Sequence, residues 1–134
     1  MTGVQTCALP ICGFIDAILN EEPTPCEEGQ GVNQDGTLTW TDNKGARYVY
    51  VMNEDSSNPR TPPNHVPEGT LWLLQVSPSD QPVASGLRYG SCPPGASQTI
   101  PSTGEPPALV RGQSYHLYVL EDVLKPITNC TFTY

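Results

Sequence analysis

The chain of 134 residues has little positive charge, since 6 Lys and Arg stand against 14 Asp and Glu and give a formal charge of −8 at pH 7. Nucleic acids and anionic membrane surfaces attract lysine and arginine, so we expect neither as a direct partner. No apolar run approaches the ~18 residues of a membrane-spanning helix. Charged residues make up 15% of a chain with 15 prolines and 12 glycines, which disfavours long surface helices. The composition predicts one domain that is poor in helix.

The sequence also lacks the usual marks of a metal or catalytic centre. It has no C-x-x-C pair, and His65 and His116 lie far from any cysteine, so a zinc site is poorly supported. Neither histidine has a recognisable nucleophile or carboxylate beside it, and we expect both at the surface. The acidic pairs Glu54–Asp55 and Glu121–Asp122 could act together only if the fold brings them into contact. We therefore predict no catalytic residue, no metal ligand and no cofactor.

The sequence does contain segments in which apolar and polar residues alternate, which is the pattern of a β-strand. Thr37–Thr41 alternates, with Leu38 and Trp40 on one face, and this predicts a half-buried strand. Arg47–Met52 is apolar on both faces, as expected of a central strand. The same signals predict further strands at 71–76, 83–89, 97–100, 115–120 and 127–134, the last two separated by Glu121–Pro126. With no amphipathic helix after residue 20, the chain is predicted to be an all-β antiparallel sandwich of about seven strands.

Two irregular segments interrupt the predicted strands. The stretch 53–68 carries four prolines and must be a loop, and it is long for a compact domain. Residues 101–107, which follow the predicted strand 97–100, form a second irregular loop. Long ordered loops often carry function, so both are candidate functional segments. An aromatic binding platform of Trp72, Tyr89 and Tyr118 is a further hypothesis, although packing in the core is the favoured interpretation of these side chains.

One motif suggests the type of sandwich. The stretch from Leu109 to Val119 has the spacing L-x-x-G-x-x-Y-x-L-x-V, with Gly112 and Tyr115 at the middle positions. It resembles the tyrosine corner of fibronectin type III and related immunoglobulin-like domains, and the resemblance covers residues 37–134. It implies that Leu109 and Gly112 form the crossing between sheets and that the Tyr115 hydroxyl bonds back to this connection.

The first residues suggest both an artefact and a compartment. Residues 1–11 resemble the conceptual translation of a common sequencing adapter, and we set them aside. The adapter also supplies the first base of codon 12, so Cys12 has a chimeric codon with Ser, Arg or Gly as alternatives. The sequence that follows resembles the start of a mature bacterial lipoprotein, with Cys12 lipidated and residues 12–36 as a tether. We therefore expect an exported protein of the periplasm or outer membrane.

The cysteine count then predicts one disulfide. With Cys7 in the adapter segment and Cys12 assigned to lipidation, Cys26, Cys92 and Cys130 remain. Export favours oxidised cysteines. Cys92–Cys130 is the first choice because both lie in the strand-rich half, and Cys26–Cys130 is the alternative, joining an N-terminal edge to the last strand.

These observations predict a monomeric, non-enzymatic binding or structural module of the bacterial envelope. Its partner would be an envelope protein or a polysaccharide, and it would contact a membrane only through the lipid anchor. One alternative is an accessory or adhesin domain from a longer secreted protein. A second alternative is a small exported enzyme whose site lies in loops 53–68 and 93–107.

Overall fold

The computed structural model describes residues 22–40, 44–123 and 125–134, so the adapter-like segment 1–11 and Cys12 lie outside the described residues. The described part is all-β and contains no helix, and therefore no helix that could span a membrane. Its strands are β1 (Thr24–Pro25), β2 (Gly31–Val32), β3 (Thr37–Thr39), β4 (Tyr48–Asn53), β5 (Thr70–Val76), β6 (Leu87–Arg88), β7 (Ala96–Ile100), β8 (Ser114–Asp122) and β9 (Lys125–Thr133).

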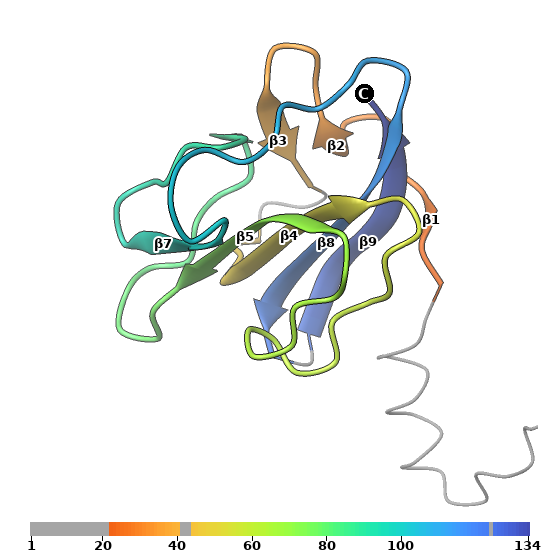
Figure 1. Cartoon of the computed structure of the whole chain (residues 1–134). Helices are drawn as coiled ribbons and strands as arrows, with labels where there is room; N and C mark the ends of the chain where they lie inside the picture. The colour runs from red at the N-terminus through yellow and green to blue at the C-terminus, as the bar shows by residue number, and fades with distance from the viewer. Residues whose placement is uncertain (1–21, 41–43, 124) are drawn as a thin grey trace, which may run out of the picture.

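The strands form two sheets in a sandwich-like arrangement (Figure 1). The larger sheet has the order β1-β9-β8-β4-β5-β7, and the smaller has the order β2-β3-β6. Every pairing is antiparallel except that of β1 with β9. Val32 and Leu38 of the small sheet share one apolar cluster with Val49, Trp72 and Leu117 of the large sheet. The core therefore lies between the two sheets.

The central strand β4 shows how both faces of the large sheet are buried. Val49 and Val51 point into the core between the sheets, whereas Tyr50 and Met52 belong to a second apolar cluster on the opposite face. All four side chains are 0% exposed. This confirms the prediction of a central strand, because alternate residues point to opposite faces and both kinds are apolar.

Two predicted strand boundaries are corrected. The strand predicted over 83–89 is reduced to β6 and an isolated bridge between Ala46 and Val83. Gly86, with a φ of +104°, interrupts the extended backbone between the bridge and β6. The predicted break at Glu121–Pro126 is much shorter, because β8 runs to Asp122 and β9 begins at Lys125. Pro126 fits into β9 because it lies at a register shift, where a missing N–H is tolerated.

The C-terminal part of the predicted tether belongs to the sheets. The predicted tether extends to residue 36, whereas β1 pairs with β9 and β2 pairs with β3 before that point. Gly31 and Val32 are buried. The described fold thus begins by Thr24 rather than at Thr37.

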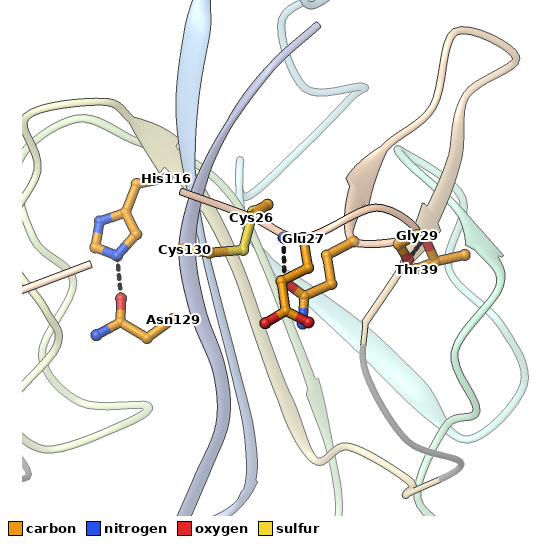
Figure 2. Close-up of a disulfide and its surroundings, with 8 residues drawn as sticks. Cys26, Glu27, Gly29, Thr39, His116, Asn129 and Cys130 are labelled. Carbon is orange, nitrogen blue, oxygen red and sulfur yellow. Dashed lines mark hydrogen bonds between the residues drawn. A yellow bond between two sulfur atoms is a disulfide. The ribbon is translucent and has the colours of Figure 1, made fainter. Parts of the chain in front are cut away.

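The first-choice disulfide Cys92–Cys130 is wrong, and the alternative is present. Cys26 is bonded to Cys130 with their Cα atoms 4.7 Å apart, across a sequence separation of 104 (Figure 2). The cause is the parallel pairing of β1 with β9, which sets Thr24 opposite Cys130 and brings Cys26 alongside. Cys92 is an exposed free thiol whose Sγ lies 3.0 Å from the carbonyl oxygen of Ala96.

Candidate functional site

The connection between β4 and β5, residues 54–69, is called the strap here. A hairpin between neighbouring antiparallel strands needs only about 2–5 residues. The strap instead lies against the face of the large sheet that points away from the small sheet (Figure 1). There the Tyr50 hydroxyl donates to the His65 carbonyl oxygen at 3.1 Å, and the His116 ring contacts the Ser56 carbonyl oxygen. Pro59 and Pro62 of the strap are buried. The strap therefore acts as a third layer.

The base of the strap is closed by hydrogen bonds between its two ends. The Asn53 N–H donates to the Gly69 carbonyl oxygen at 2.8 Å, and the Ser56 hydroxyl donates to the Glu68 carbonyl oxygen at 2.8 Å. Gly69 has a φ of +94°, and a Cβ there would collide with the Ser56 hydroxyl oxygen. Glycine is thus required at this position both by conformation and by space.

The tip of the strap is held by His65. The ring Nδ1 of His65 accepts a hydrogen bond from the Arg60 N–H at 2.8 Å, and the His65 N–H donates to the Thr61 carbonyl oxygen at 2.9 Å. The strap is therefore a structured loop with its own hydrogen bonds, as loops that cover a core must be.

His116 is buried under the strap, which corrects the expectation of a surface histidine. Its ring is 0% exposed, with Nε2 at 2.7 Å from Asn129 Oδ1 and Nδ1 at 3.1 Å from the Ser56 carbonyl oxygen. Figure 2 shows His116 and Asn129 on one side of β9 and the Cys26–Cys130 bond on the other. Because a carbonyl oxygen can only accept, the Nδ1 of His116 carries a proton in this contact.

A polar hollow of about 470 Å³ opens at the base of the strap. The pocket is lined by the last residue of β4 and by residues from both ends of the strap. These are Asn53, Asp55, Ser56, Ser57, Glu68 and Gly69. We call it the strap pocket. Its lining residues include two carboxylates but no cationic or aromatic side chain, so it suits a ligand that brings hydrogen-bond donors. Its volume is within the usual range for small-ligand sites.

The aromatic side chains considered as a platform pack in the core instead. Trp72 is 0% and Tyr118 is 1% exposed. Tyr89 is half-buried with its ring edge-on to Trp72, at a centroid distance of 5.3 Å. Burial raises the pKa values of Tyr50 and Tyr89 well above the usual range, so both hydroxyls stay neutral. The second candidate loop is fixed by the Gln98 side-chain amide, which donates to the carbonyl oxygens of Pro101 and Gly104.

The predicted contact of the tyrosine motif is present. The Tyr115 hydroxyl accepts a hydrogen bond from the Val110 N–H at 2.8 Å, so it bonds back to the connection that precedes β8. Gly112 has a φ of +85°, and Leu109 packs against the core between the sheets. The implied crossing between sheets at Leu109 and Gly112 is wrong, because their segment connects β7 to β8 and both strands belong to the large sheet. The spacing predicted the hydrogen bond of Tyr115 alone.

The acidic pairs are kept apart by the register of β4 and β8. Asn53 pairs with Tyr115 and Tyr48 pairs with Leu120, so Glu54 and Glu121 follow opposite ends of the β4–β8 ladder. Within residues 22–40, 44–123 and 125–134, no group of three His, Cys, Asp or Glu could hold a metal ion.

Several residues of the site had no signal in the sequence. Ser56, Glu68 and Gly69 meet only because the strap folds back on itself, and Asn129 is identified only by its contact with the buried ring of His116. Comparison with protein-family models, curated proteins and solved structures finds no match to this chain.

Proposed function

We propose that this chain is a non-enzymatic binding module of the bacterial envelope, exported and anchored by a lipid on Cys12. The Cys26–Cys130 disulfide supports export, because disulfides persist in oxidising compartments and are rare in the cytosol. The charge of −8 suits a module that approaches a membrane through its anchor rather than through its surface.

The sandwich is proposed to be of the fibronectin type III or immunoglobulin-like type. The hydrogen bond from the Val110 N–H to the Tyr115 hydroxyl supports this, because a tyrosine at the start of a strand that bonds to the preceding connection is typical of such domains. In these folds, ligands are commonly bound by loops at the ends of the strands.

The strap pocket is the observation on which the binding function rests. A short turn would connect β4 to β5, yet the chain builds an ordered cover and places a polar hollow at its base. The carboxylates of Asp55 and Glu68 and the amide of Asn53 can accept hydrogen bonds from hydroxyl or ammonium groups. A hydroxyl-rich envelope polysaccharide supplies such donors, and we assign it as the ligand.

An NMR titration of the full chain with soluble peptidoglycan fragments tests this function. We expect amide shifts confined to Asn53, Ser57, Gly69 and their neighbours, and a loss of affinity of about tenfold in Asp55→Asn. Glu54→Gln is the matched control, since it removes the adjacent carboxylate, which does not line the pocket. Unchanged spectra, or equal losses in the two variants, would contradict the proposal.

The anchor is tested separately. The genomic sequence upstream of codon 12 should encode a signal peptide that ends immediately before a cysteine codon. A coding region that continues upstream would instead support the accessory or adhesin domain of a longer secreted protein.

A further inference from the structure

Ser56 connects the strap pocket to the buried face of the sheet. Its side chain lines the pocket and bonds the Glu68 carbonyl oxygen, while its own carbonyl oxygen is the partner of His116 Nδ1. His116 lies on β8, opposite Met52 of β4 and Thr131 of β9, and is separated from Ser56 by 60 residues in sequence. One hydrogen bond from the interior thus reaches the backbone of the pocket wall.

We propose that His116 is the positioning residue of the strap pocket and that it acts through Nδ1–H. The inference rests on the proposed function for the use of the pocket, although its structural test needs no ligand. His116 itself is fully buried and is not among the residues that line the pocket. It holds the Ser56 backbone, and through it the flanking Asp55 and Ser57, in the geometry of the pocket wall.

The two contacts of the ring are not equivalent. The Ser56 carbonyl oxygen can only accept, so this contact requires a proton on Nδ1, which the neutral Nδ1–H tautomer and the imidazolium both supply. The side-chain amide of Asn129 carries an acceptor and a donor, and a half-turn of the amide lets it serve Nε2 in either role. The bond to Ser56 is therefore the invariant contact, whereas the bond to Asn129 adapts to the ring.

Two substitutions of His116 separate these contacts. In His116→Asn the side-chain amide can place an N–H donor near the position of Nδ1, and in His116→Gln the longer side chain places its amide near the position of Nε2. Only the first can keep the bond to the Ser56 carbonyl oxygen. The pair therefore tests the position of the donor rather than the loss of the imidazole.

Amide hydrogen exchange of the full chain gives the readout. The Asn53 and Ser56 N–H groups bond within the base of the strap, and the amides of Val49 and Val51 report the core. In His116→Gln, we expect the amides of Asn53 and Ser56 to exchange about tenfold faster than in the unmodified chain. In His116→Asn, they should exchange at nearly the unmodified rate. The amides of Val49 and Val51 should exchange at an unchanged rate in both variants. The chemical shifts of the Asp55, Ser57 and Gly69 amides should likewise change more in His116→Gln than in His116→Asn.

The outcomes distinguish this role from a general effect on folding. Equal loosening of the strap in both variants, or parallel loosening of strap and core, would overturn the proposal. If His116→Gln does not fold, Asn129→Ala replaces it. That variant removes the contact at Nε2 and keeps the imidazole with its Nδ1, so Asn53 and Ser56 should exchange at the rate of the unmodified chain. Faster exchange of these two amides would count against the role of Nδ1. If the peptidoglycan titration shows no binding while the two His116 variants differ clearly in amide exchange, that result contradicts the proposed ligand and supports the positioning role of His116.

Discussion

The two faces of the large sheet are both buried, but they are covered in different ways. The face toward β2, β3 and β6 packs apolar side chains of one sheet against another. The opposite face, with Tyr50, Met52 and Tyr118, is covered by the strap. A covering strand can bond its backbone within its own sheet, whereas a covering loop must find other partners for its polar groups. This difference explains why His116 and the Tyr50 hydroxyl, which both contact carbonyl oxygens of the strap, lie on that face.

The largest expected effect concerns the covalent link on the inter-sheet face. Cys26–Cys130 closes a loop of 104 residues, and a loop of this length corresponds to about 4–5 kcal/mol in the chain-entropy model. Urea denaturation of a Cys26→Ala/Cys130→Ala variant should show a loss of that order. Cys92→Ser is the matched control and should unfold at the same urea concentration as the unmodified chain. A larger loss in Cys92→Ser than in the double variant would contradict the pairing.

A pair of leucines on β8 compares the two covers directly. Leu117 is buried between the sheets at 0% exposure, and Leu120 points to the strap side at 2% exposure. The cost of a leucine-to-alanine change depends on how well the surroundings collapse into the cavity, and a loop can move more easily than a sheet. We expect about 4 kcal/mol for Leu117→Ala and about 2–3 kcal/mol for Leu120→Ala. Equal values would show that the strap is as rigid as a sheet.

A smaller change in the free energy of unfolding is expected from the buried hydroxyl of Thr128 on β9. Thr128 is 5% exposed, and its hydroxyl has no hydrogen-bond partner in the described part of the chain. Replacing a buried hydroxyl without a partner by a methyl group removes the cost of desolvating it. Thr128→Val should therefore raise the free energy of unfolding by about 1 kcal/mol. Thr128→Ser, which keeps the hydroxyl and loses the methyl group, should lower it, and a destabilised valine variant would indicate a hidden partner.

The smallest effect lies at the turn between β2 and β3, remote from the strap. The Thr37 N–H donates to the Asp35 carboxylate at 2.9 Å and holds the pKa of Asp35 below its usual value. Folding therefore favours the ionised form. The contribution to stability is present above the unfolded-state pKa of about 3.9 and is lost as pH falls through the lower folded-state pKa. In Asp35→Asn, the free energy of unfolding should therefore fall less steeply than in the unmodified chain as the pH is lowered. An unchanged slope would contradict this assignment.

The strands with a strong local pattern could be predicted from the sequence. Leu38 and Trp40 alternate with threonines, β4 is apolar on both faces, and the tyrosine spacing indicated the bond now observed at Tyr115. In each case the information lies within about ten neighbouring residues.

The remaining features depend on contacts between distant parts of the chain. β1 and β2 have two residues each, too few to show a period, and β1 is placed by its pairing with β9. The choice between Cys26 and Cys92 follows from that pairing. The burial of His116 depends on the path of the strap, and nothing in the local sequence around His116 indicates that Ser56 will lie above it.

The ring protons of the two histidines test the structured strap most directly. In the described structure the Nδ1 of His65 accepts from the Arg60 N–H, whereas the Nδ1 of His116 donates to the Ser56 carbonyl oxygen. Nitrogen-15 spectra of the imidazole rings should therefore show the ring proton on opposite nitrogens of the two histidines. We predict Nε2–H for His65 and a slowly exchanging Nδ1–H for His116. An Nε2–H tautomer or a solvent-averaged ring at His116 would contradict the account of the strap as a layer fastened to the sheet.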